Sequence, residues 1–162
     1  MNKVESLQKV RTEMETKYHP MPHGVQGNRD CAIVSMANYF DVPYDRIMSM
    51  ARAIDPKTCI GRRGTSNSTT LYVVRQILKE RNPELNVDSI KWIKWAPRPN
   101  RSALASLKHK VFTKSGLLST YHGKLHHLQM VKNNDIIGTR GQVETLQDIR
   151  NRGNHVRAFI EC

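Results

Sequence analysis

The sequence has few cysteines, few aromatic residues and no long apolar run, and each shortage excludes a class of protein. Its three cysteines are an odd number without regular spacing, which excludes a disulfide framework. No two of them have the CxxC separation of a zinc site. No segment reaches the roughly 18 apolar residues of a membrane-spanning helix, and the N-terminal segment lacks the apolar centre of a signal peptide. We therefore expect a soluble, cytoplasmic protein with no membrane partner.

Acidic residues are scarce relative to basic ones. The chain has 26 Lys and Arg against 14 Asp and Glu, which gives a net charge of +12. Such a surface attracts polyanions, either nucleic acid or acidic proteins. The same charge is also typical of a protein whose basic surface only interacts with water. The sequence has neither a glycine–aromatic strand signature nor a metal-bound finger, so no nucleic-acid-binding motif adds to the evidence of the charge. The charge leaves nucleic acid and an acidic protein open as partners, and it does not fix the oligomeric state.

The length and the apolar content predict one domain over residues 1–162. Apolar residues make up 38% of the chain, which is enough for a single core. We expect an N-terminal helical extension over residues 1–20, with apolar residues at helical spacing within 2–17. After a loop rich in Pro and Gly, Asp30 precedes the apolar segment CAIVSMANYF. We expect that segment to be a helix with Asp30 as its N-cap.

The remaining pattern changes from helices to strands. A second helix is expected at 44–54, and a third begins after Ser66 or Ser68. Asn133-Asn134-Asp135 is a hairpin signal between two strands. The other expected elements are a strand at 87–95, a helix at 101–112, strands at 116–123, 126–133 and 135–139, helical turns at 144–151 and a strand at 156–162. Helices followed by an antiparallel sheet predict an α+β fold.

Cys31 is the first residue of the expected apolar helix, and this position can activate a thiol. A helix N-terminus supplies free N–H groups and partial positive charge, and a histidine on a later strand can accept the proton. The structural alternative is an inert buried thiol, because cysteine is among the most buried residue types. Cys59 and Cys162 lie in a polar loop and at the C-terminal end of the sequence, and we assign them no role.

Several motifs around Cys31 occur in an order that resembles a known family. They are Asp30-Cys31-Ala32, Pro43-Tyr44, Gly64-Thr65, and Gly123 followed by HHLQMVKNNDIIGT. Together with GVQGNRDCAIVSMANYF they cover residues 24–141 and resemble small papain-like cysteine peptidases of phages and bacteria, similar to double-glycine-leader peptidases. The resemblance implies a papain-like fold and a cysteine peptidase or hydrolase that acts on a protein or peptide without a cofactor. It places the protein in the host cytoplasm if a phage encodes it.

The resemblance also implies roles for three residues. Cys31 would be the nucleophile, His127 the general base, and Gln26 a donor to the oxyanion, helped by the backbone N–H of Cys31. His126 and His127 are adjacent in a strand and therefore point to opposite faces. His126 shares its face with core residues, so His127 is favoured as the base, with His126 as the alternative.

The chain departs from the family where an Asp normally orients the histidine. Gly138-Thr139 stands at that place, and only the turn residues Asn133, Asn134 and Asp135 could substitute. Loss of such an orienting group slows related triads by about four orders of magnitude. The alternative function is therefore a catalytically degenerate, basic protein of the same fold that binds nucleic acid or an acidic protein. No metal is expected, because the histidines near the hairpin lack a Cys, Asp or Glu at ligand spacing.

Overall fold

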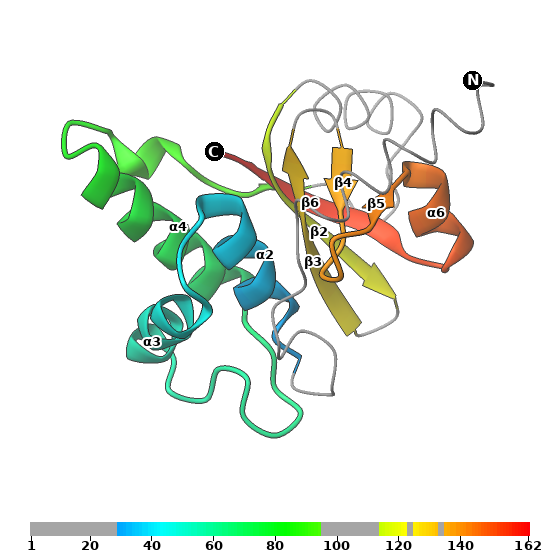
Figure 1. Cartoon of the computed structure of the whole chain (residues 1–162), viewed down its shortest axis with the longest axis horizontal. Helices are drawn as coiled ribbons and strands as arrows, with labels where there is room; N and C mark the ends of the chain where they lie inside the picture. The colour runs from blue at the N-terminus through cyan, green and yellow to red at the C-terminus, as the bar shows by residue number, and fades with distance from the viewer. Residues whose placement is uncertain (1–28, 95–113, 123–124, 133–134) are drawn as a thin grey trace.

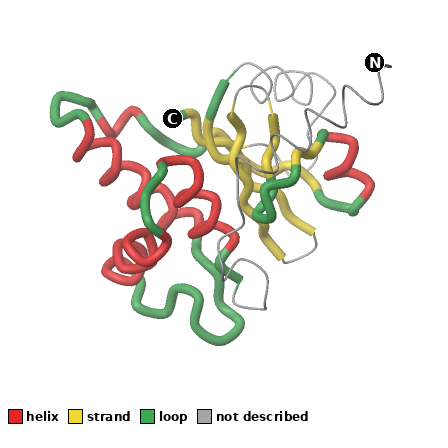
Figure 2. The backbone as a smooth tube through the Cα atoms, viewed as in Figure 1, coloured by secondary structure: helices red, strands yellow, loops and turns green. Residues whose placement is uncertain are grey.

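The computed structural model describes residues 29–94, 114–122, 125–132 and 135–162. Among these residues, three helices come first and gather on one side of an antiparallel sheet (Figures 1 and 2). They are α2 (Cys31–Phe40), α3 (Tyr44–Ile54) and α4 (Asn67–Arg81). The expected order of helices followed by strands is therefore confirmed, and the fold class is α+β.

The sheet has six strands in the order β1-β6-β2-β3-β4-β5, and every neighbouring pair is antiparallel. Its long central strands are β2 (Gly116–His122), β3 (Leu125–Lys132) and β6 (His155–Glu161). The short strands are β1 (Ile93–Lys94), β4 (Asp135–Ile137) and β5 (Val143–Glu144). Lys132 pairs with Asp135 in the antiparallel pairing of β3 with β4, which confirms the prediction that these two strands form a hairpin.

The sheet has a buried core on each face. On the first, which we call the α2 face, Leu117, Leu128, Met130 and Ile160 pack with the apolar residues of α2, α3 and α4. On the second, the α6 face, Leu118, Val131 and Phe159 pack against α6 (Leu146–Asn151), which lies on the other side of the sheet in Figure 1. Side chains alternate between faces along each strand, so this division assigns each residue of β2 and β3 to one side.

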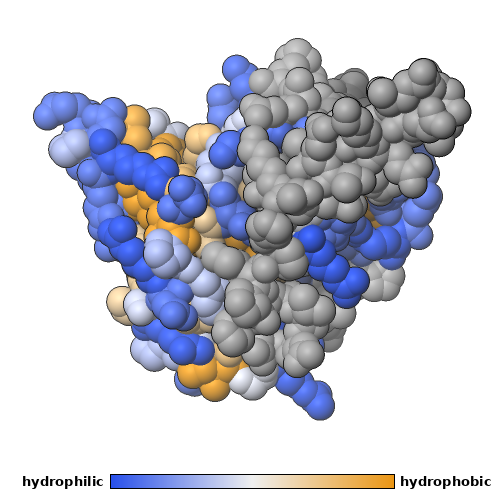
Figure 3. Space-filling model, in the orientation of Figure 1, coloured by the Kyte–Doolittle hydropathy of each residue, from blue (hydrophilic) through white to orange (hydrophobic). Residues whose placement is uncertain are grey.

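Helix α2 is buried on nearly all sides because it lies between the sheet and the other two helices. Ile33, Val34 and Met36 are completely buried, as a helix that is apolar all round requires. On the face shown in Figure 3, hydrophilic residues cover most of the described part, with an apolar strip over the helical layer. None of the described helices has the length and hydropathy needed to cross a membrane.

Two local predictions were confirmed only in part. Asp30 stands at the N-cap position of α2 but makes no capping hydrogen bond with its side chain, because its carboxylate accepts one from Tyr44 instead. The strand predicted at 87–95 is reduced to β1, and Val87–Ser89 form a 3-10 turn (η1). The side chain of Asn86 accepts the N–H of Asp88 and stabilises this turn.

Two other helices begin with a side-chain cap, one of them predicted. Ser66 caps α4 by accepting the N–H of Thr69, as predicted. Thr145 and Asp148 form a reciprocal capping box at the start of α6. The helices predicted at 2–17 and 101–112 lie outside the described residues.

Candidate active site

Cys31 lies where the start of α2 meets β3. Its half-buried side chain packs against the core of the α2 face. Backbone hydrogen bonds from Leu128 of β3 and from Ala32 favour its thiolate. One turn later, the Ser35 hydroxyl donates to the carbonyl oxygen of Leu128 over 3.0 Å. Residues four apart lie on the same side of a helix, so Cys31 and Ser35 together fix the start of α2 to one residue of β3.

Burial nevertheless keeps the Cys31 thiol protonated in the resting protein. Desolvation raises its pKa above the ordinary value of 9.0 and outweighs the two backbone hydrogen bonds, and the negative charge of Asp30 raises it further. A protonated thiol is a poor nucleophile. Cys31 therefore needs a nearby base that removes its proton as it attacks.

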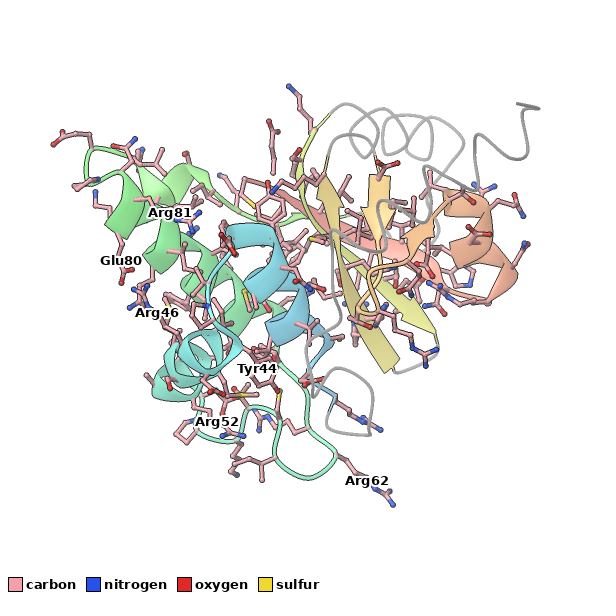
Figure 4. All side chains as sticks on the ribbon, viewed as in Figure 1. Tyr44, Arg46, Arg52, Arg62, Glu80 and Arg81 are labelled. Carbon is pink, nitrogen blue, oxygen red and sulfur yellow. The ribbon has the colours of Figure 1, made fainter. Side chains whose placement is uncertain are left out.

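The motifs that suggested the family come together around the start of α2. Tyr44 begins α3, and its hydroxyl donates to the buried Asp30 carboxylate over 2.6 Å; Figure 4 shows it between the two helices. Burial and this bond raise the pKa of Tyr44 well above its usual range. A Cβ on Gly64 would meet the carbonyl oxygen of Arg29 at 3.2 Å, so the loop passes close to the residues before Cys31. Distant parts of the sequence thus build one region.

The loop before α4 also brings a second thiol to this region. Cys59 Sγ lies 3.6 Å from the carbonyl oxygen of Arg29 and 3.6 Å from Thr65 Oγ1. Burial raises the pKa of the Cys59 thiol, and the Thr65 hydroxyl opposes that shift. We assign Cys59 no chemical role, because its contacts are those of a thiol that holds the loop against the helix start.

Two of the described histidines, His126 and His155, lie on the same face of the sheet as Cys31, and His126 is the one on the strand that Cys31 contacts. His126 precedes Leu128 by two residues on β3, so the two side chains point to the same side, with Cα atoms about 7 Å apart at the usual rise of a strand. Leu128 belongs to the core of the α2 face. His126 is exposed, and its pKa is lowered by partial burial and then by the nearby Arg157. His126 thus carries a neutral imidazole on this face of β3, two residues along the strand from the residue whose backbone contacts Cys31.

His127 points to the opposite face. It pairs with Thr120, and the next residue on its side, Gln129, donates a hydrogen bond to the buried Glu144, which also binds Arg152. Burial lowers the pKa of His127, and the charge of Arg152 lowers it further. The structure therefore does not bring together the predicted pair of Cys31 and His127.

The alternation in the sequence favours His127 as the base, because His126 shares its side of β3 with core residues and such residues are usually structural. The opposite inference applies here, because α2 itself packs on the apolar face of β3. A histidine that faces the first residue of α2 must share its side of the strand with Leu128 and Met130. The sequence contained this signal in the alternation of β3.

No described residue orients His126 as the family's Asp would. Asp135 pairs with Lys132, six residues along β3 from His126, which is about 20 Å away at the usual strand rise. At Gly138, a Cβ would clash with the Gln142 side chain, so the packing around this position suits glycine. Gln26, Asn133 and Asn134 lie outside the described residues.

The described part of the chain contains no group of three or more His, Cys, Asp or Glu placed to hold a metal ion. Comparison of the chain with family models, with curated proteins and with solved structures finds no match. The geometry itself defines an α+β protein with a thiol at the start of a buried helix and an imidazole on the adjacent strand. A thiol and an imidazole can transfer an acyl group through a thioester when the two lie within hydrogen-bond reach of each other.

Proposed function

We propose that this protein is a papain-like cysteine hydrolase of amide or related acyl bonds, with Cys31 as nucleophile and His126 as general base. The observation that carries the proposal is the junction of α2 and β3. There the Cys31 thiol bonds to the Leu128 backbone, two residues from His126 on the same face. The sequence motifs implied a nucleophile on a helix start and a histidine on a strand, with His127 as that histidine; the proposal keeps Cys31 and replaces His127 by His126.

The reaction begins from a neutral pair, because the pKa of Cys31 is raised and that of His126 is lowered. His126 accepts the thiol proton as Sγ attacks the carbonyl carbon of the substrate. The imidazolium then gives this proton to the leaving amine, and the acyl group stays on Cys31 as a thioester. Water, deprotonated by His126, adds to the thioester and releases the acid and the free thiol.

The start of α2 supplies donors for the oxyanion of each tetrahedral intermediate. The Asp30 carboxylate bonds to Tyr44 and does not cap the helix, so it does not occupy the N–H groups at the start of α2, among which that of Ala32 bonds to the Cys31 thiol. These N–H groups and the positive end of the helix dipole favour an anion there. Gln26 remains the predicted second donor.

A mixture of randomised peptides, with cleavage products read by mass spectrometry, tests the proposal. We expect wild-type protein and His127→Gln to cleave peptides, and Cys31→Ala to be inactive. His126→Gln should cleave at least about 100-fold more slowly, since general bases contribute two to four orders of magnitude. Cleavage by Cys31→Ala, or no product from any wild-type preparation, would contradict the proposal.

A second candidate is the same fold acting as a binding protein without turnover. The raised pKa of Cys31 favours it, as does the lack of a described residue that orients His126. This candidate predicts that Cys31→Ala keeps the biological effect of the protein. The peptide experiment separates the two, because only the hydrolase loses its product on this substitution.

A further inference from the structure

Three rings and one guanidinium lie side by side at the end of the sheet near the proposed site. Tyr121 of the central strand β2 has His126 of β3 on one side and His155 of β6 on the other. The ring centroids are 6.5 Å apart for Tyr121 and His126 and 5.4 Å apart for Tyr121 and His155. The Arg157 guanidinium lies 5.8 Å from the centroid of the Tyr121 ring. We call these four residues the aromatic row.

The aromatic row is open to solvent. His126, His155 and Arg157 are exposed, and Tyr121 is half-buried. The register places Tyr121, His126 and His155 on the α2 face, beyond the part of it that packs against the core, so the exposed rings of His126 and His155 are not used by that packing. The register of β2 against β6 shifts between Ser119 and Thr120, where Arg157 of β6 is the extra residue, and the Arg157 guanidinium lies over the Tyr121 ring.

The charge at the row is positive, and no carboxylate of the described residues forms an ion pair with it. None of the four ion pairs among those residues includes Arg157. Among the described residues, Arg157 is also the charged group that lowers the pKa of His126. Over the whole chain the net charge is +12. A ligand of this surface should therefore combine negative charge with flat aromatic groups.

We propose that the aromatic row binds single-stranded nucleic acid, with bases stacked on the exposed rings and on the Arg157 guanidinium and with the phosphates drawn by the basic surface. Stacking on aromatic rings and on guanidinium planes, together with a positive surface, is how proteins hold single strands without reading sequence. An acidic peptide would use the charge of Arg157 but would leave the row of rings unused. The inference goes beyond the proposed hydrolase function and does not depend on the chemistry of Cys31.

Fluorescence anisotropy of a labelled 12-nucleotide oligothymidine tests this inference. Arg157→Gln and His155→Ala should each weaken binding by about 5-fold or more, since stacking contributes roughly 1–3 kcal/mol per base. Arg157→Gln should also reduce the slope of log K against log salt by about 0.7, the value for one phosphate of a single strand that the protein no longer neutralises. Cys31→Ala should bind like wild type, even if the peptide experiment finds no hydrolysis.

The matched control is Arg150→Gln, which removes the same charge from an exposed position of α6 on the opposite side of the sheet. It should leave binding close to wild type. Equal losses for Arg150→Gln and Arg157→Gln would overturn the inference, because binding would then depend only on total charge. It would also be overturned if polyglutamate competed with the oligonucleotide as well as unlabelled oligothymidine does, or if wild-type protein did not bind the oligonucleotide at low salt.

Discussion

The Ser35 hydroxyl donates a hydrogen bond to the carbonyl oxygen of Leu128 over 3.0 Å, and both groups are buried. This bond joins α2 to β3 and holds Cys31, one turn earlier, against the same strand. Ser35→Ala should therefore lower the free energy of unfolding by about 1–3 kcal/mol, the cost of a buried acceptor left unpaired. Urea denaturation measures this, with Ser49→Ala on the exposed surface of α3 as a control of little effect. Equal stability of the two variants would contradict the role given to Ser35.

Tyr44 stabilises a buried carboxylate. Its hydroxyl is the donor to Asp30, which is only 3% exposed. Tyr44→Phe removes this donor with little change of shape, so it should cost about 1.5–3 kcal/mol, as for other hydrogen bonds to charged groups. Thermal or urea unfolding measures the loss. Tyr72→Phe is the matched control, because that side chain is 57% exposed; a loss of similar size there would show that the effect is not specific to Asp30.

His127 should make the stability of the protein sensitive to acid. Burial and Arg152 lower its pKa in the folded state below the ordinary 6.5, so the unfolded chain takes up a proton first. The contribution to stability is complete above pH 6.5 and is lost as the pH falls below that value. Urea midpoints measured between pH 8 and pH 5 should therefore fall less in His127→Gln than in wild type. Parallel curves for the two proteins would contradict the half-buried, neutral state of His127.

The Cys31 thiol should react slowly with iodoacetamide at neutral pH. Desolvation raises its pKa above 9.0, so the thiolate fraction is small at pH 7 and increases with pH beyond that value. The rate of alkylation, followed by peptide mapping to separate Cys31 from Cys59 and Cys162, should rise through and above pH 9. A rate that is already constant between pH 6 and pH 8 would instead show a preformed ion pair and would contradict the neutral resting state.

Much of the fold could be predicted because its elements have local signals. The apolar run after Asp30, the cap at Ser66 and the hairpin at residues 133–135 each depend on neighbouring residues alone. The role of Asp30 could not be predicted, since its partner Tyr44 reaches it from the next helix. The local sequence favours Asp30 as a side-chain cap of α2. In the folded protein its carboxylate instead accepts a hydrogen bond from the Tyr44 hydroxyl of α3.

The candidate site was predicted only in part. Cys31 at the start of a buried helix follows from its position in the sequence, and it lies there in the structure. The choice between His126 and His127 depends on which face of β3 receives α2, a relationship between segments almost a hundred residues apart. The aromatic row was not predicted either, because it requires the pairing of β6 with β2 and a bulge that places Arg157 beside Tyr121.

The most direct test of the central claim, that Cys31 works with His126 and not with His127, is the rate at which p-nitrophenyl acetate acylates Cys31. This activated ester needs no specific binding site, and mass spectrometry with peptide mapping locates the acetyl group. The same substitution at adjacent positions, His126→Gln and His127→Gln, compares the two faces of β3 directly. We predict that His126→Gln slows acylation of Cys31 by about 100-fold or more, as loss of a general base does, and that His127→Gln leaves the rate unchanged. Slow acylation of Cys31 in His127→Gln, together with an unchanged rate in His126→Gln, would contradict the account.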